Sequence, residues 1–153
     1  MTINNERNDA INPHIIRLFE NNRLYHFSFC SFYGQIYGIR TEQNQLIVSN
    51  CFFEDCRIAV QTSKCDSCLV TLCSFYNNGY GFKTELVEGK SDSSIKIAQN
   101  IFDNCSNAGI DALNFSNVWV QNNYFYQCEV GFYCSYYSKY FLKYNSFEEC
   151  NYC

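Results

Sequence analysis

The sequence predicts an all-β solenoid, because one short motif recurs along almost the whole chain. Each copy has apolar residues seven and five positions before a phenylalanine, and usually Asn or Cys two positions before it. The phenylalanines are Phe32, Phe53, Phe75, Phe102, Phe125 and Phe147, with gaps of 21, 22, 27, 23 and 22 residues. A period in the low twenties is typical of a solenoid with one coil per repeat.

Apolar residues that alternate within each repeat predict short strands. Val118 and Val120 are spaced by two residues, as are Leu46 and Val48, and this spacing places both members of a pair on one face of a strand. A coil of two or three short strands buries its inward face only against the next coil, with strands in parallel at about 4.8 Å. We therefore expect one buried stack of Val48, Val70, Ile97, Val120 and Leu142.

Three further positions of the repeat are restricted to a few residue types. The position two before the phenylalanine holds Cys30, Cys51, Cys73, Asn100, Asn123 and Asn145, and the position three after it holds Gln35, Cys56, Asn78, Cys105, Cys128 and Cys150. A later position holds Gly38, Ala59, Gly81, Gly109 and Gly131. We expect this small residue at a bend, where glycine tolerates positive φ or a close backbone approach.

The pattern Asn-x-Phe, between alternating aliphatic residues and a Gly-aliphatic pair, resembles the right-handed parallel β-helix of the pectin-lyase-like superfamily. It is carried by Asn100-Ile101-Phe102, Asn123-Tyr124-Phe125 and Asn145-Ser146-Phe147, with cysteine versions at Cys30, Cys51 and Cys73. The resemblance covers residues 24–153 and implies a right-handed parallel β-helix of about five to six coils. It also implies an asparagine ladder, in which the side-chain amide of each Asn bonds to the next coil. At the three positions of this column that hold cysteine, we expect an apolar stack of thiols instead.

The two ends of the chain are expected to differ from the repeats. Residues 1–23 are expected to form a polar tail and a short capping helix over 10–21, because Ile11, Ile15, Leu18 and Phe19 fall at helical spacing after the Asn12-Pro13 pair. This helix either covers the open end of the repeats or lies along their side. At the other end, no polar capping segment follows the last coil. We therefore expect this coil to self-associate, to be covered by a partner, to be tolerated without a cap, or to continue into a longer chain.

Composition narrows the class of protein. The 153 residues carry a net charge of −4 without a basic run, so nucleic acid is not an expected partner. No apolar run approaches the length of about 18 residues that a membrane-spanning helix needs. Eleven cysteines, an odd number, together with a polar start, favour reduced thiols in an intracellular protein. The alternative is a surface or secreted protein of which this chain is a fragment.

The sequence offers few candidates for chemistry. Two CxxC pairs, Cys65/Cys68 and Cys150/Cys153, would lie about four coils or roughly 19 Å apart, too far to share a zinc ion. We expect no metal and no cofactor. The catalytic motifs of the polygalacturonase-like enzymes are not found, and neither His14 nor His26 is flanked by glycines.

The residues that directly follow the six phenylalanines are the best candidates for a functional site. This column alternates aromatic and acidic residues: Tyr33, Glu54, Tyr76, Asp103, Tyr126 and Glu148. If these point outward, Glu54 and Asp103 are weak catalytic candidates at about 9–10 Å, the outer edge of the range for inverting glycosidases. Tyr76 and Tyr126 are candidates for ligand binding, and an exposed strand that avoids aggregation is the simpler interpretation.

These observations predict a non-catalytic repeat module with a structural or interaction role, within a larger surface protein if the chain is a fragment. Its expected partner is a protein or a glycan. The resemblance implies the alternative, a protein that binds or cleaves polysaccharide as a glycoside hydrolase or a polysaccharide lyase.

Overall fold

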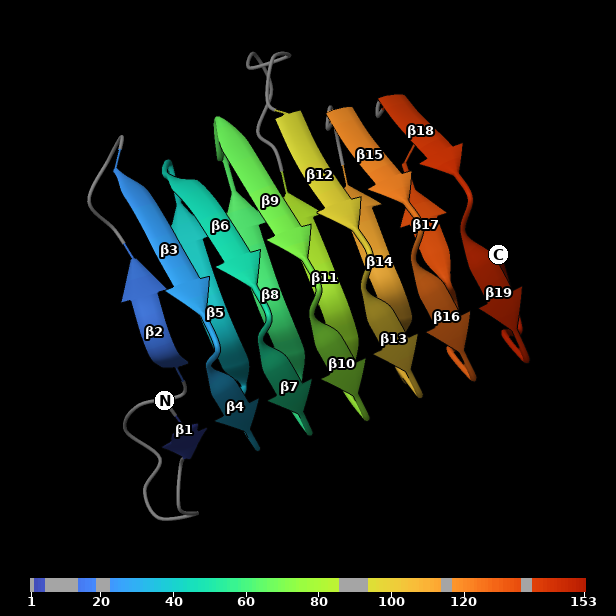
Figure 1. Ribbon diagram of the computed structural model, residues 1–153, viewed down its shortest axis with the longest axis horizontal. Coiled ribbons are helices and arrows are strands. Elements are labelled where there is room, and N and C mark those ends of the chain that lie inside the picture. The colour runs from blue at the N-terminus through green and yellow to red at the C-terminus, as the bar shows by residue number, and fades with distance from the viewer. Residues whose placement is uncertain (1, 5–13, 19–22, 86–93, 114–116, 136–138) are drawn as a thin grey trace.

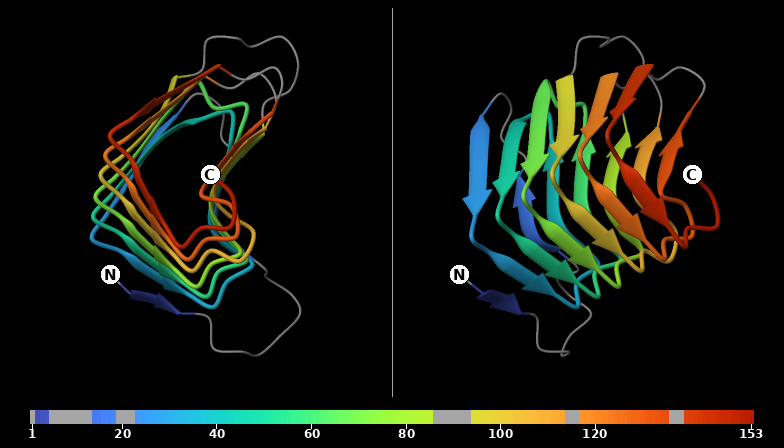
Figure 2. Two further views of the ribbon diagram at one scale, coloured as in Figure 1. Left: turned by 90° about the vertical axis from the view of Figure 1, so that its right-hand side faces the viewer. Right: turned by 45° about the vertical axis from the view of Figure 1, so that its right-hand side comes forward.

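A computed structural model describes residues 2–4, 14–18, 23–85, 94–113, 117–135 and 139–153. The described residues form nineteen strands and no helix, so nothing in them could cross a membrane as a helix. The chain winds through successive coils that stack along one axis, and each coil adds one strand to each of three parallel sheets (Figures 1 and 2).

We name the three sheets A, B and C. Sheet A consists of three-residue strands: β1 Thr2–Asn4, β4 Ser31–Tyr33, β7 Phe52–Glu54, β10 Ser74–Tyr76, β13 Ile101–Asp103, β16 Tyr124–Tyr126 and β19 Ser146–Glu148. Sheet B consists of β2 His14–Leu18, β5 Tyr37–Glu42, β8 Ile58–Ser63, β11 Tyr80–Glu85, β14 Ala108–Leu113 and β17 Phe132–Cys134. Sheet C consists of β3 Leu24–Ser28, β6 Gln45–Ser49, β9 Ser67–Thr71, β12 Ser94–Ala98, β15 Asn117–Gln121 and β18 Lys139–Lys143. A coil therefore runs from sheet C through sheet A to sheet B.

Equivalent residues of successive repeats pair in register, which turns each column of the sequence into a stack in space. The six phenylalanines of the motif form one stack with ring centroids 4.6–5.1 Å apart and interplanar angles of 4–7°. Val48, Val70, Ile97 and Val120 form the expected aliphatic stack and have no exposed surface. The fifth member, Leu142, pairs with Val120 but is 45% exposed, because β18 has a neighbouring strand on one side only.

Each described bend between sheets C and A, and between sheets A and B, contains one residue in the left-handed region, and most of these residues are not glycine. The column between sheets C and A holds Phe29, Asn50, Leu72, Gln99, Asn122 and Tyr144, with φ of 51–58°. The column between sheets A and B holds Gly34, Asp55, Asn77, Asn104, Gln127 and Glu149, with φ of 50–64°. Asn and Asp adopt this region more readily than other non-glycine residues, but Phe and Leu are strained in it. Stacking of coils on both sides therefore holds the bend in place.

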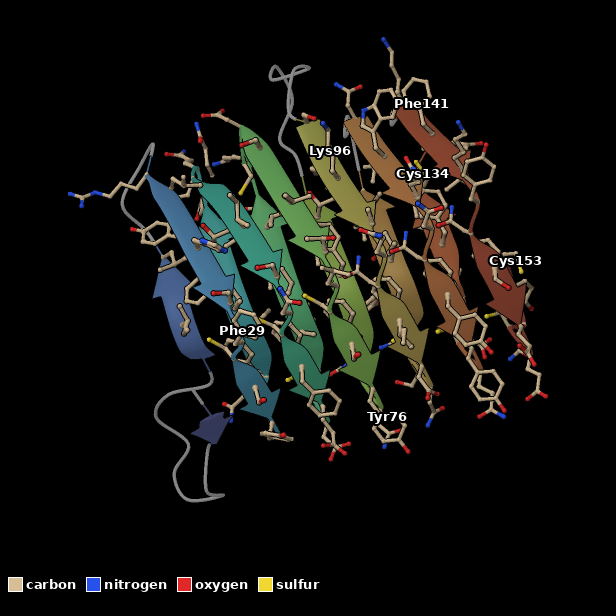
Figure 3. The ribbon with its side chains drawn as sticks, in the orientation of Figure 1. Phe29, Tyr76, Lys96, Cys134, Phe141 and Cys153 are labelled. Atoms are coloured by element: carbon tan, nitrogen blue, oxygen red, sulfur yellow. The ribbon has the colours of Figure 1, made fainter. Side chains whose placement is uncertain are left out.

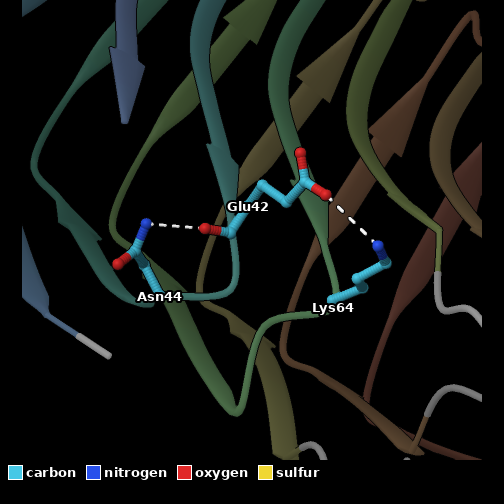
Figure 4. Close-up of polar contacts among 3 residues, drawn as sticks. All are labelled: Glu42, Asn44 and Lys64. Carbon is cyan, nitrogen blue, oxygen red and sulfur yellow. Dashed lines mark hydrogen bonds and ion pairs between the residues drawn. The ribbon is translucent and has the colours of Figure 1, made fainter. Parts of the chain in front are cut away.

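The bend between β5 and β6 is held by polar contacts as well. Asn44 is buried and donates from Nδ2 to the carbonyl of Glu42 at 2.7 Å (Figure 4). The Glu42 carboxylate pairs with Lys64 of the next coil at 3.4 Å. The ion pair is partly exposed and adds little stability, whereas the buried amide satisfies backbone groups that water cannot reach.

The asparagine ladder is present where the sequence places Asn. Asn100 donates from Nδ2 to Asn123 Oδ1 at 3.0 Å, and Asn123 donates in the same way to Asn145 Oδ1 at 3.0 Å. Each Oδ1 also accepts the backbone N–H of the preceding rung at 2.9–3.0 Å. In the cysteine half, the Cys51 and Cys73 thiols instead donate to carbonyls two residues earlier in the chain. The ladder thus joins coils through amides in one half and packs thiols in the other.

The small-residue column does not lie at a bend, which corrects the sequence-based expectation. Gly38, Gly81 and Gly109 are the second residues of β5, β11 and β14, and none has positive φ. The side of the Cα atom where a side chain would begin faces the phenylalanine stack in these glycines. A Cβ on Gly81 would lie 2.5 Å from Phe102 Cδ1 and 2.7 Å from the carbonyl oxygen of Gly109. The glycines are needed for close approach to the rings.

We expect Gly81→Ala to destabilise the protein by about 1–3 kcal/mol, because an overpacked core must shift a ring and a backbone carbonyl. Gly34→Ala is a matched control, since nothing lies within 4 Å of its Cβ position. Its own, smaller destabilisation comes from the φ of +64°, at which an alanine backbone is strained. Chemical denaturation of the two variants checks the difference. Equal stabilities would contradict the steric role of Gly81.

The prediction of a capping helix over residues 10–21 is wrong for residues 14–18, the part of this range that the structure describes. Residues 14–18 form β2, which pairs in parallel with β5 so that Ile16 lies beside Ile39. A short helix is marginal on its own, whereas a strand on the edge of sheet B gains backbone partners at once. Ile11 and Phe19 lie outside the described residues.

Candidate functional site

The aromatic and acidic column lies on the outer face of sheet A. Successive strands pair Tyr33 with Glu54, Glu54 with Tyr76, Tyr76 with Asp103, Asp103 with Tyr126, and Tyr126 with Glu148. The phenylalanine before each of these residues points into the core, so the column points outward. Tyr76 is 39% exposed, at the end of β10 that lies at the lower edge of Figure 3.

A second outward column on the same strands was missed by the sequence reasoning. It contains Phe52, Ile101 and Tyr124, each two residues before a member of the first column. The Tyr124 and Tyr126 rings lie 6.2 Å apart at 9°, and the Tyr33 and Phe52 rings lie 5.7 Å apart at 52°. Alternation along each strand could have found this column, because residues two apart share a face. The face is therefore broader and more aromatic than the single column suggests.

The acidic residues of sheet A form no compact catalytic pair. Glu54 and Asp103 are half-buried and lie on strands separated by β10, so their backbones are about 9.6 Å apart with Tyr76 between them. Among the described residues, neither carboxylate makes an ion pair, and the strands of sheet A contain no Lys, Arg or His. The geometry thus provides neither a basic neighbour nor a close second acid.

Tyr124 is the group on this face whose ionisation is most altered. Its hydroxyl donates to Glu148 Oε2 at 2.6 Å, and this hydrogen bond raises the pKa of Tyr124 to about 12. The carboxylate of Glu149 likewise raises the pKa of Tyr126. Both shifts arise because loss of the phenol proton would place a second negative charge beside an acid.

We expect Tyr124 to remain protonated at pH 11, where an ordinary tyrosine has lost its proton. The folded pKa lies above the ordinary value of 10.0, so the hydrogen bond contributes fully below pH 10 and is lost as the pH rises through about 12. Glu148→Gln should return the pKa towards 10. NMR titration of ring-labelled tyrosine measures both, and an unchanged pKa in the variant would contradict the assignment.

The cysteines form interior columns and not a reactive centre. All eleven are free thiols, and eight are buried. Burial raises the pKa of Cys56 and of Cys65 to about 11. A hydrogen bond from Cys73 lowers the pKa of Cys51 to about 7 and raises that of Cys73, but both side chains are almost wholly inaccessible. Low accessibility makes such thiols poor nucleophiles despite a favourable pKa. That they stay reduced in the cell remains a prediction.

Neither His26 nor the CxxC pairs form a metal site in the described part of the chain. His26 lies on the outer face of β3, with Nε2 3.3 Å from Ser49 Oγ. Cys65 and Cys68 are buried, while Cys153 is exposed on the last coil. Within the described ranges, no group of three or more His, Cys, Asp or Glu side chains could hold a metal ion.

These observations describe in-register coils, three parallel sheets, and interior ladders of Phe, Asn and Cys. A comparison with protein families agrees: the model described as "Right handed beta helix region" matches residues 2–151. The chain belongs to the right-handed β-helix family. Comparisons with curated proteins and with solved structures returned no match. The match is consistent with the resemblance to the pectin-lyase-like superfamily.

The other two outer faces of this β-helix also carry ordered side chains. On sheet B, the Arg40 guanidinium lies over the Tyr37 ring at 5.1 Å, and Lys83 lies over Tyr80 at 4.7 Å. Lys83 also pairs with the buried Asp111 at 3.4 Å. These cations are half-buried and already engaged within the β-helix, so they are not presented to a partner.

On sheet C, Trp119 and Phe141 stack with centroids 4.0 Å apart, and they are 46% and 51% exposed. Two shallow hollows lie on this face. One of about 310 Å³ is lined by Leu24, Ile47, Leu69 and Lys96, and the other of about 510 Å³ is lined by Trp119, Phe141 and Lys143. Neither hollow is lined by both an acid and a base.

Proposed function

We propose that this β-helix is a non-catalytic interaction module that binds a partner through the outer face of sheet A. The observation that supports the proposal is the regular alternation of aromatic and acidic rungs, in register from Tyr33 to Glu148. Exposed tyrosines contribute large contact area at a small entropic cost, as in many protein interfaces. Acids without basic neighbours select a partner that presents positive charge.

The positions of the carboxylates on sheet A also support a role without catalysis. General acid–base chemistry needs a carboxylate whose pKa is shifted by burial or by a close charge. Glu54 and Asp103 are half-exposed and stand on either side of Tyr76. We therefore regard them as recognition residues.

Glycan binding is the second candidate, because Tyr76 and Tyr126 could stack on sugar rings as aromatic rungs two coils apart. The charge of the face restricts the ligand class. Glu54, Asp103 and Glu148 would repel the carboxylates of an acidic polysaccharide, and sheet A has no basic strand residue to offset them. A neutral glycan is thus favoured over the acidic chains on which enzymes of the superfamily act.

Binding to defined probes tests both candidates. Wild type is applied to a lysine-rich peptide, a neutral xylan and a polygalacturonate, and the variant Tyr76→Ala/Tyr126→Ala is compared with Tyr133→Ala, an exposed tyrosine on sheet B. We expect binding to the peptide or the xylan, at least about tenfold weaker in the double variant and unchanged in the control. Preferred binding to polygalacturonate, or equal loss in both variants, would contradict the role of sheet A.

A further inference from the structure

Charge is divided between two outer faces of this β-helix. The strands of sheet C contain Lys96, Lys139, Lys143 and His26 but no Asp or Glu. The strands of sheet A contain Glu54, Asp103 and Glu148 but no Lys, Arg or His. The whole chain has a net charge of −4, so the outer face of sheet C is more positive than the protein as a whole.

The two faces also share a pair of neighbouring residues, one charged and one aromatic. On sheet C, Lys96 pairs in register with Trp119 and Trp119 with Phe141, whereas Lys143 lies two residues further along β18, beside Gln121 (Lys96 and Phe141 are labelled in Figure 3). On sheet A, Asp103, Tyr126 and Glu148 occupy three neighbouring strands, β13, β16 and β19. Each face therefore has a charged residue beside an aromatic residue on the next strand, about 4.8 Å away, and the two charges have opposite signs.

We infer that sheet C of one copy docks against sheet A of a second copy, with Lys96 facing Asp103 and Trp119 facing Tyr126. The inference rests on the proposed interaction role of sheet A and names its partner. The three lysines of sheet C are exposed, whereas Arg40 and Lys83 of sheet B are half-buried against tyrosines. Of the three, Lys143 lies over the Tyr144 ring at 4.7 Å. The acidic face of a neighbour therefore meets exposed positive charge on sheet C.

The geometry predicts the strength and the symmetry of the contact. Sheet A is only three residues wide, about 10 Å, so the buried area falls at the low end for specific complexes and association should be weak. The two surfaces are different, so the contact is heterologous and leaves one free face of each kind on a dimer. Since its charges stay near water, the association should weaken as salt rises.

Sedimentation velocity of the full chain at increasing concentration tests this inference. Wild type should associate at low salt and dissociate at high salt. Lys96→Glu alone and Asp103→Lys alone should each raise the dissociation constant by more than about tenfold, because each places like charges together. An equimolar mixture of the two variants should associate again, because the intact sheet C of one meets the intact sheet A of the other.

Arg57→Glu is the matched control, since it reverses an exposed charge in the bend between β7 and β8, outside both faces. It should associate like wild type, and circular dichroism should show that all variants are folded. A monomeric wild type at every concentration, unchanged association of Lys96→Glu, or a mixture that stays monomeric would overturn the inference. If wild type is monomeric but the peptide or xylan still binds through Tyr76 and Tyr126, only self-association fails and the proposed function stands.

Discussion

Replacing Val120 by aspartate is expected to unfold the protein at room temperature. Val120 has no exposed surface and lies between Ile97 and Leu142 in the aliphatic stack of sheet C. An aspartate there buries an unpaired charge between two coils, which costs more than about 4 kcal/mol and is comparable to the whole stability of a small domain. Circular dichroism and urea denaturation measure the loss.

Gln121→Asp provides the control for this substitution. Gln121 is the next residue on β15 and points outward, exposed to solvent. The same new carboxylate should change the free energy of unfolding by less than about 0.5 kcal/mol at that position. Comparable destabilisation by the two variants would mean that the inside and outside of β15 are assigned wrongly.

Asn123→Leu is expected to destabilise the β-helix by about 3–5 kcal/mol, although leucine is apolar and of similar size. The Asn123 amide accepts from the backbone N–H and from Nδ2 of Asn100, and it donates to the carbonyl of Ile97 and to Asn145. Leucine leaves these groups buried without partners, and each unsatisfied group costs about 1–3 kcal/mol.

The thiol half of the same column supplies the comparison for this prediction. Cys51 occupies the equivalent position two coils before Asn100, and its thiol bonds to a carbonyl of its own bend at 3.3 Å and to the Cys73 thiol. Cys51→Ala should therefore cost about 1 kcal/mol, the loss of a small buried side chain. If Asn123→Leu proved as mild as Cys51→Ala, the amides would not be joining the coils.

Much of this fold could be predicted because each column of the repeat has one physical role. Apolar residues at alternating positions, followed by Asn or Cys and then Phe, are required wherever a coil stacks on the next. The phenylalanine stack therefore follows from the spacing, whereas the ladder of Asn100, Asn123 and Asn145 was implied by the resemblance to the pectin-lyase-like superfamily. The register of the outer column of sheet A follows from the same spacing.

Other features depend on tertiary contacts that the pattern does not contain. Residues 14–18 show helical and strand spacing alike, and pairing with β5 decides between them. The glycine column was assigned to a bend because glycine favours bends, whereas its role comes from rings on another strand. The division of charge between sheets A and C appears only once the outward residues of separate repeats are placed side by side. The candidate site is therefore harder to predict from the sequence than the fold, because stacking of the coils does not constrain the residues at surface positions.

The most direct test of the central claim, that this β-helix binds and does not cleave, is a search for reaction products. Purified protein is incubated with polygalacturonate, pectin and xylan, and new reducing ends and unsaturated products are measured over time. We predict no product above a sample without protein, because Glu54 and Asp103 lack the neighbours that acid–base chemistry requires. Cleavage of any of these chains by wild type, lost in Asp103→Asn, would contradict the account.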